Sequence, residues 1–406
     1  MVAAPGPRLS RLRAALQVAL SFGVALPVAW GFIQLAHPYW ETVPRPGVRL
    51  TPSLAAKLHA QHHAVTLLAL VLFGIVTVIS QLGITDTRPR DQARTYVGIP
   101  VAMSAGGALG IWLIPHHTVG LVVLALVCGA GAYASRFVPR LGTRAAVWGS
   151  LLFPSYLTGF LAGQAIPLHE FYWYVAIVSL AAAVGLVLQL AIYNPLAVTQ
   201  VPRPSRSSPA GAAAVSSGPS RLAARLHLDA PAQAAIRVAL AVGAATAAGS
   251  LISEGRYYWA TIAAYVAYRG GANTARKQVI KATQRTAGTV VGILLGSLVA
   301  HAIGPTTWSL AVILPAVAVF AYFRRAHYGL AVVALTIMIA ELYDLFGEYS
   351  SHLLIARLEI TAVGSAIGAV VAVLVFPVAE PNAARSHVDR RGRGDHAAPP
   401  VEARPT

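Results

Sequence analysis

The sequence predicts an all-α integral membrane protein with about twelve transmembrane helices in two six-helix halves and both termini in the cytoplasm. Hydrophobic residues make up 56% of the chain, whereas charged residues make up only 11%. A chain of this composition cannot cover a water-facing surface with charge in the usual way. Apolar stretches of transmembrane length recur along it, and the basic residues favour every second connection between them. These three observations indicate a multi-pass membrane protein.

Twelve apolar windows are long enough, or nearly so, to cross the hydrocarbon core of a bilayer. That core is ~30 Å thick, and crossing it takes ~20 mostly apolar residues at helical rise. The windows lie near residues 15–36, 62–83, 95–115, 118–134, 145–166, 172–193, 233–252, 257–269, 286–303, 306–323, 328–345 and 355–377. The window at 257–269 is the shortest of them. The first window is too long for a cleaved signal peptide and is expected to be a retained helix.

The placement of basic residues assigns a side of the membrane to each connection. Basic residues gather in alternate connections, within 8–13, 88–94, 136–144, 203–225, 269–285, 324–325 and 385–404. The other side receives only Arg45, Arg49, Lys57, Arg256 and Arg357. The positive-inside rule places the basic side, and with it both termini, in the cytoplasm. The net charge of +17 is therefore explained by topology, and no nucleic-acid partner is expected.

A polar stretch between the sixth and seventh windows divides the chain. Its Pro, Ser, Ala and Gly residues show no hydrophobic period, which is typical of a flexible linker. The expected organisation begins with a cytoplasmic N-terminus (residues 1–14) and a first six-helix half (15–193). A cytoplasmic linker (194–232), a second six-helix half (233–378) and a disordered tail (379–406) follow. Two pairs of short similar segments, PYWE with YYWA and ARTYVG with QRTAG, suggest that the two halves arose by duplication.

The stretch from Tyr257 to Gly296 carries the most specific motif of the chain. An aromatic Tyr-Trp-Ala entry opens a short apolar helix, and a basic connector then leads into an Arg-x-x-Gly-Thr-x-x-x-Gly helix formed by Arg285, Gly288, Thr289 and Gly292. A second element, ARLEITAVGSAIGAVVAVLVFP, spans Ala356 to Pro377. In this order the two elements resemble the FUSC family of fusaric-acid-resistance and aromatic-acid-exporter-like membrane proteins, over roughly Arg237 to Pro377.

The resemblance implies a bacterial inner-membrane transporter that exports organic anions, namely aromatic or other weak carboxylic acids. The fold resemblance extends loosely to plant malate channels, so a passive anion channel is one alternative. A non-transporting membrane scaffold subunit of a cell-envelope assembly is another. The expected partners are the lipid bilayer, a small organic anion, and either a second copy of the chain or an envelope protein.

Two arginines are expected to contact the substrate because each shares a helix face with glycines. Arg285 aligns with Gly292 and Gly296, and Arg357 aligns with Gly364 and Gly368, at the i, i+7 and i+11 positions that return to one face. Gly288 belongs to the same set of packing positions, since small residues let membrane helices approach closely. A guanidinium group binds a carboxylate through two parallel hydrogen bonds. We expect the two arginines at opposite mouths of an anion pathway. The alternatives are a positive-inside anchor for Arg285 and an internal ion pair for Arg357.

Aromatic residues accompany the first of these helices. Trp259 occupies the motif position and is expected to present its ring to an aromatic substrate. The neighbouring tyrosines have the same chemistry, but Tyr and Trp also gather at membrane interfaces, and that explanation is favoured for Tyr257 and Tyr258.

Acidic residues are scarce, which makes those inside apolar windows notable. Glu359 lies about one turn inside the last window and is expected either to couple transport to protons or to pair with Arg357 or Arg256. Glu341, Asp344 and Glu348 follow one side of a helix and are expected at a solvated helix end, with a cation-attracting vestibule as the alternative.

Enzyme signatures are missing from the sequence. It contains no G-x-x-x-x-G-K-[ST] phosphate loop, no H-E-x-x-H, no G-x-S-x-G and no dinucleotide fingerprint. Neither an enzyme nor a cofactor is expected, and transport would depend on an ion gradient. His59, His62 and His63 have helical spacing for metal ligands, but no cysteine or nearby carboxylate completes a site, so no metal is expected.

Overall fold

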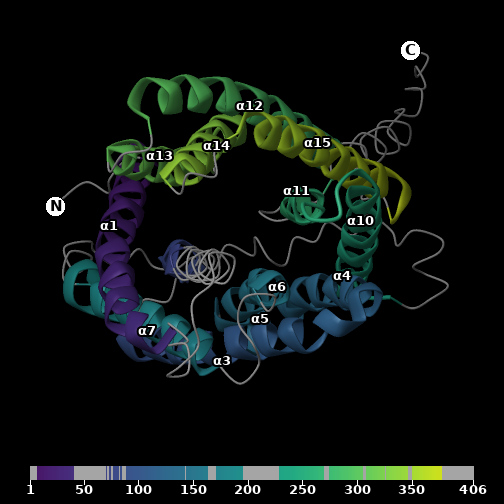
Figure 1. Ribbon diagram of the computed structural model, residues 1–406. Helices are drawn as coiled ribbons and strands as arrows, with labels where there is room; N and C mark the ends of the chain where they lie inside the picture. Colours follow the sequence, from purple (N-terminus) through teal and green to yellow (C-terminus); the bar gives the residue numbers. More distant parts are fainter. Residues whose placement is uncertain are drawn as a thin grey trace, which may run out of the picture.

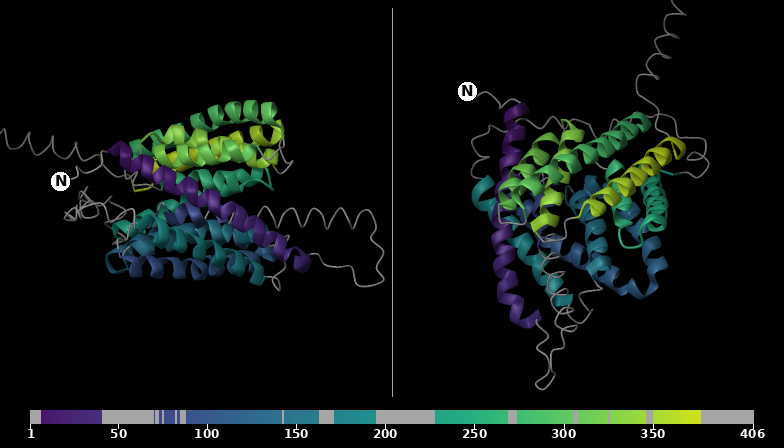
Figure 2. Two further views of the ribbon diagram at one scale, coloured as in Figure 1. Left: turned by 90° about the vertical axis from the view of Figure 1, so that its left-hand side faces the viewer. Right: turned by 45° about the horizontal axis from the view of Figure 1, so that its top comes forward.

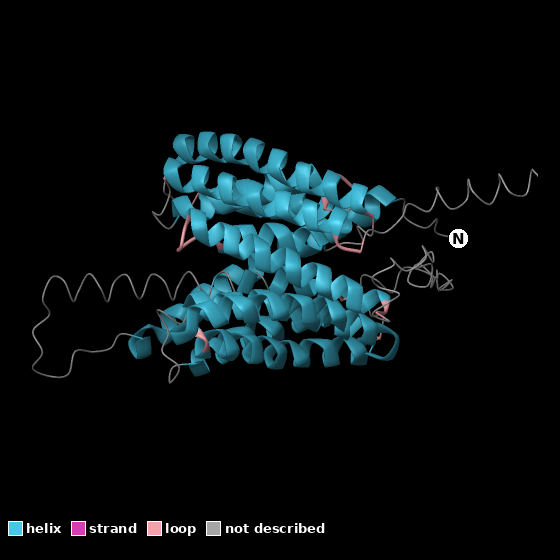
Figure 3. Cartoon of the chain, turned by 90° about the vertical axis from the view of Figure 1, so that its right-hand side faces the viewer, coloured by secondary structure: helices cyan, strands magenta, loops and turns pink. Residues whose placement is uncertain are grey.

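A computed structural model shows a helical protein, with helices throughout the part of the chain that it describes (Figure 3). It describes residues 7–40, most of 70–84, 88–141, 143–162, 171–194, 228–268, 274–304, 308–324, 326–345 and 350–376. The predicted linker, the C-terminal tail and the histidines near residue 60 lie outside the described residues, apart from the two ends of the linker.

The described helices follow the predicted windows closely. In the first part of the chain they are α1 (Pro7–Trp40), α3 (Pro89–Trp112), α4 (His117–Tyr133), α5 (Val138–Leu141), α6 (Thr143–Ala162) and α7 (Phe171–Leu188). A π-helical turn at Gln189–Tyr193 continues α7. The second window is represented by helical residues between 70 and 83.

In the second part of the chain the structure describes six further helices. They are α10 (Ala230–Ile252), α11 (Tyr258–Tyr268), α12 (Ala275–Ile303), α13 (Ser309–Phe323), α14 (Tyr328–Leu345) and α15 (Ser351–Leu374). Side-chain oxygens of Asp229, Thr274 and Ser350 accept hydrogen bonds from the first turns of α10, α12 and α15. Such caps satisfy backbone N–H groups that have no partner within the helix.

The start of α12 differs from the expectation. Hydropathy predicted a helix from residue 286, whereas α12 begins at Ala275, so the basic residues Arg276, Lys277 and Lys281 lie on its first turns. Lysine and arginine are good helix formers, and Thr274 caps the helix through the N–H of Lys277. The charged connector is therefore in large part a helical extension of the membrane segment.

The helices form two layers (Figure 1). One layer contains α12, α13, α14 and α15, and the other contains α3, α4, α5, α6 and α7. Figure 2 shows the layers edge on, with α1 crossing from one to the other. α1 packs on α13 and α7, and α10 packs on α4 and α15, so these two helices connect the layers. α11 lies inside the ring that the other helices form.

The same kinds of contact recur in both layers. α3 packs on α6 and α7, just as α12 packs on α14 and α15, and each first helix packs on the other layer, α1 on α13 and α10 on α4. This matching set of contacts supports the duplication of two six-helix halves, which stays a prediction along with the cytoplasmic position of both termini.

Small residues let the central helices of each layer approach closely. A Cβ at Gly292 of α12 would lie 2.5 Å from Thr336 Cβ of α14, and one at Gly296 would lie 2.8 Å from Ala340 Cβ. In the other layer a Cβ at Gly110 would meet the backbone of α6. Glycine at these positions allows the backbone contact that stabilises membrane helix pairs.

The opposite faces of the helices are exposed and apolar. On α12, Leu294 and Leu298 point away from the glycine face and are each 66% exposed. Within the described residues, seven helices are long and apolar enough to cross a membrane, and the 15-residue α13 is also apolar. α11 has 11 residues, which gives ~17 Å at helical rise, well short of ~30 Å of hydrocarbon. The fold is that of a helical membrane protein with a short helix inside it.

Candidate anion-binding site

Arg357 of α15 stacks on Trp259 of α11. Its guanidinium carbon lies 4.2 Å from the centre of the indole ring. Arg357 is 3% exposed, and its Nε and Nη1 atoms have no hydrogen-bond partner among the described residues. The indole Nε1 of Trp259 is also buried without a partner. The two side chains therefore bring a positive charge and three hydrogen-bond donors into the protein interior.

The close approach of α11 and α15 produces this stacking. Gly364 of α15 lies against the backbone of Ala260, where an added Cβ would come within 2.6 Å of Ala260 Cα. The hydroxyl of Tyr268 donates to the carbonyl oxygen of Gly368 at 3.0 Å, which fixes the other end of the pair. Because Arg357 shares the glycine face, the same packing turns its side chain toward α11.

Contacts from α10 and α12 hold α11 in place. The hydroxyls of Thr246 in α10 and Thr261 in α11 form a hydrogen bond of 2.7 Å. Lys281 of α12 donates to the carbonyl oxygen of Val266 at 2.7 Å, near the C-terminal end of α11. A cation at this end satisfies a free carbonyl and complements the helix dipole. The basic helical extension of α12 thus positions the short helix that carries Trp259.

Arg285 is the second buried guanidinium group of this layer. It is 5% exposed, its Nη1 donates to the hydroxyl of Tyr328 at 3.2 Å, and its Nε has no partner. We expected it at the mouth opposite Arg357. The charge of Arg285 interacts with that of Arg357, and the position of the two arginines at opposite mouths of a pathway stays a prediction. Neither forms an ion pair with a described residue.

Tyrosines surround the Arg357–Trp259 pair. Tyr258 lies next to Trp259, with ring centroids 5.1 Å apart, and Tyr343 of α14 packs against the same cluster. Tyr343 also interacts electrostatically with Arg357. Tyr257, for which a membrane interface was favoured, is buried, and its ring lies 5.9 Å from that of His117 in α4.

The glycines predicted to pack helices divide into two sets. Gly288, Gly292 and Gly296 face α14, and Gly364 and Gly368 face α11. The contact at Gly368 is looser than that at Gly364, since an added Cβ would lie 3.5 Å from Ala264 Cα.

Glu359 lies away from the two arginines. Its side chain is exposed on α15, and no ion pair joins it to Arg357 or Arg256 among the described residues. The expected structural ion pair is therefore not formed. The sequence explains this position. Residues i and i+2 of an α-helix are about 200° apart around the helix axis, so Glu359 faces outward when Arg357 lies on the inward glycine face.

Glu341 and Asp344 are the residues that sequence reasoning placed wrongly. We favoured a solvated helix end, but Glu341 is 0% exposed and Asp344 is 7% exposed. Neither oxygen of Glu341 has a hydrogen-bond partner among the residues that the structure describes, and the same holds for Oδ2 of Asp344. The predicted window at 328–345 did include both residues, which was a signal that they belong to the membrane segment.

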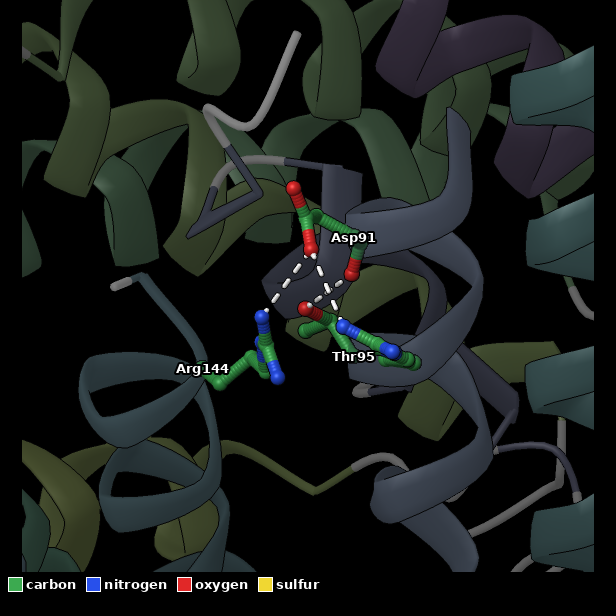
Figure 4. Close-up of polar contacts among 4 residues, drawn as sticks. Asp91, Thr95 and Arg144 are labelled. Carbon is green, nitrogen blue, oxygen red and sulfur yellow. Dashed lines mark hydrogen bonds and ion pairs between the residues drawn. The ribbon is translucent and has the colours of Figure 1, made fainter. Parts of the chain in front are cut away.

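The ends of α3 and α6 carry a different kind of charged contact (Figure 4). Arg144 Nη2 donates to Asp91 Oδ1 at 3.0 Å, and Arg94 Nη1 lies 3.7 Å from the same oxygen. The backbone oxygen of Asp91 accepts a hydrogen bond from Thr95 at 2.9 Å. Here each charge has a partner, in contrast to Arg357 and Arg285. No group of three or more potential metal ligands occurs in the described part of the chain.

Apolar helices of transmembrane length and glycine-mediated packing together define a multi-pass membrane protein. Residues 240–371, which include both arginines and Trp259, match the family described as fusaric acid resistance protein-like. This similarity over part of the chain agrees with the family that its motifs predicted. Neither the curated proteins nor the solved structures contain a match. The chain is therefore a helical membrane protein, and residues 240–371 are similar to the fusaric acid resistance family.

Proposed function

We propose that the protein exports organic anions, namely aromatic or other weak carboxylic acids, from the cytoplasm across a bacterial inner membrane, driven by an ion gradient. The observation that carries the proposal is the buried stacking of Arg357 on Trp259, with guanidinium and indole N–H groups left without partners. An isolated buried charge is costly, and its usual remedy is an opposite charge that also accepts hydrogen bonds. A carboxylate supplies both.

The surroundings of the site favour an aromatic carboxylate. Trp259, Tyr258 and Tyr343 provide ring faces beside the guanidinium group. Ring faces contact another aromatic ring in several offset geometries, so one site accepts related aromatic acids. Arg285 adds a second positive charge to the same region. A like-charge pair of this kind is stabilised when an anion lies near both groups.

α11 has the character of a binding element in a transporter. It is too short to span the membrane and lies inside the ring of longer helices (Figure 1). Short or interrupted helices in transporters commonly line the substrate site between repeats. Basic residues on the first turns of α12 lie on the expected cytoplasmic side and would raise the local concentration of anions there.

The test is uptake of labelled 4-hydroxybenzoate by liposomes that contain the purified protein. The proposal predicts saturable uptake that competes with benzoate and not with the uncharged benzamide. It also predicts accumulation above equilibrium when a proton gradient of the correct sign is imposed. Equilibration without accumulation would indicate a passive channel. No protein-dependent uptake of any organic anion would indicate a scaffold subunit, whose partner would be a second copy or an envelope protein.

A further inference from the structure

A buried pair of carboxylates lies at the end of α14, on the side that faces α13. Glu341 and Asp344 are three residues apart and therefore lie on the same side of the helix. Ser309, the first residue of α13, is 0% exposed, and its hydroxyl has no hydrogen-bond partner. It interacts with Glu341 without a well-formed hydrogen bond. Glu341 is therefore close to two other buried polar side chains, Asp344 and Ser309.

The helices packed against α14 provide no counter-charge for this pair. Glu341 interacts electrostatically with Asp344, and no cationic group interacts with either carboxylate among the described residues. The described titratable or charged residues near the facing ends are exposed His301 on α12 and exposed His352 on α15. Further along, α13 carries Tyr322, and α15 carries Glu359 and Arg357, which faces Trp259. The cations of α12 lie in its first turns, at Arg276, Lys277, Lys281 and Arg285.

Two adjacent carboxylates without a cation cannot both stay ionised in a desolvated site. Burial disfavours the charged form of each group, and repulsion between the two adds to this effect. The usual outcome is that the pair holds a proton, which satisfies one carboxylate as a donor and leaves the other as its acceptor. A divalent cation would require more oxygen ligands than these three side chains supply.

We infer that Glu341 and Asp344 form the proton-binding site that couples anion export to a proton gradient. This inference rests on the proposed function and replaces Glu359 as the coupling residue. Glu341 accepts a proton from one side of the membrane as an O–H bond forms, and it releases the same proton to the other side as that bond breaks. No other bond changes and no electron is transferred.

α14 provides a direct connection between this pair and the anion site. Tyr343, between the two acidic residues in sequence, packs against the cluster that contains Trp259 and interacts electrostatically with Arg357. One helix therefore presents the carboxylates toward α13 and a tyrosine toward α11 and α15. A change in the position of α14 when the pair gains or loses its proton would alter the surroundings of Arg357.

The first experiment detects the proton without any transport. Infrared spectra of the purified protein at neutral pH are expected to contain the C=O stretch of a protonated carboxyl group. Glu341→Gln is expected to remove or shift this band, Asp344→Asn to shift it, and the matched control Glu359→Gln to leave it unchanged. Unaltered size-exclusion profiles and melting temperatures show that the variants are folded. A parent spectrum without this band at neutral pH overturns the inference even if anion transport is observed.

The second experiment measures coupling in liposomes. Glu341→Gln is expected to retain exchange of labelled 4-hydroxybenzoate between equal pools and to lose its accumulation under an imposed proton gradient, while Glu359→Gln retains both. Accumulation by Glu341→Gln at the parental level would overturn the inference. If the parent moves no anion, the proposed function fails separately, and the infrared result decides whether the pair binds a proton.

Discussion

The guanidinium carbon of Arg357 lies 4.2 Å above the ring of Trp259, and the two residues come from helices that are far apart in the sequence. A cation over an indole ring is stabilised by about 0.5–2 kcal/mol, with the larger values at desolvated sites. This is much less than the cost of burying an unpaired charge. The pair is therefore expected to be completed by an anion.

Replacement of the indole ring is expected to reduce the affinity for the anion more than it reduces the stability of the fold. Trp259→Leu removes the ring face and the indole donor that would contact the substrate, so we expect an increase in the Kd for 4-hydroxybenzoate of about 2- to 12-fold, from about 0.5–1.5 kcal/mol for an aromatic pair. Trp259→Phe keeps a ring face and is expected to lose less affinity for 4-hydroxybenzoate than Trp259→Leu. Titration calorimetry in detergent measures both values. Equal affinity in the Leu variant and the parent would exclude Trp259 from the site.

The two glycines of α15 provide a matched pair for the packing argument. At Gly364 an added methyl group would collide with the backbone of Ala260, whereas at Gly368 it would make an ordinary contact. Gly364→Ala is expected to destabilise the protein by about 1–3 kcal/mol, the range for overpacking. Gly368→Ala is expected to have a much smaller effect.

Thermal unfolding in detergent distinguishes the two glycine variants. The account requires a clearly lower melting temperature for Gly364→Ala than for Gly368→Ala. Equal melting temperatures would mean that α11 and α15 do not approach each other as closely as the structure shows, and the position of Arg357 over Trp259 would then lose its support.

The ion pair between Asp91 and Arg144 is expected to contribute modestly to stability. Both side chains are partly exposed, at 28% and 24%, so screening by water and salt limits the contribution to about 1 kcal/mol. Asp91→Asn, Arg144→Gln and the double variant form a cycle that isolates this contribution. The coupling energy is expected to decrease as salt is added. A coupling of zero at low salt would contradict the contact shown in Figure 4.

Hydropathy predicted the helices well because lipid imposes a strict requirement on them. The predicted window at 328–345 coincides with α14, and the window at 118–134 differs from α4 by one residue at each end. In a bilayer the backbone N–H and C=O groups must form their hydrogen bonds within the helix, so the length of an apolar segment predicts the length of its helix. The start of α12 was missed because its first turns are charged, although Thr274 is a capping residue that could have indicated it.

The orientation of acidic side chains was harder to predict than the position of the helices. On α15 the glycine stripe defines the buried face, and applying it to Glu359 as well as Arg357 would have placed the glutamate outside. α14 contains one glycine, Gly329, near its start, so no such stripe marks the face that buries Glu341. Glu341 is buried because α13 packs on that face of α14, and the sequence pattern of α14 does not show which of its faces α13 covers.

The interaction between Arg285 and Arg357 could not be predicted from either helix alone. Each arginine was placed on its own glycine face, but their relative depth depends on how α12 and α15 are offset along their axes. Topology suggested opposite sides because both arginines fall near the N-terminal ends of windows that cross the membrane in opposite directions. In the structure the charges of the two residues nevertheless interact with each other.

The central claim is that Arg357 binds the carboxylate of the substrate, and direct binding to purified protein tests it most simply. Titration of 4-hydroxybenzoate into the parent, Arg357→Gln and the control Arg144→Gln compares an unpaired buried arginine with one that already has a carboxylate partner. We expect binding by the parent and by Arg144→Gln, and none by folded Arg357→Gln. Binding of equal affinity in folded Arg357→Gln and in the parent would contradict the account.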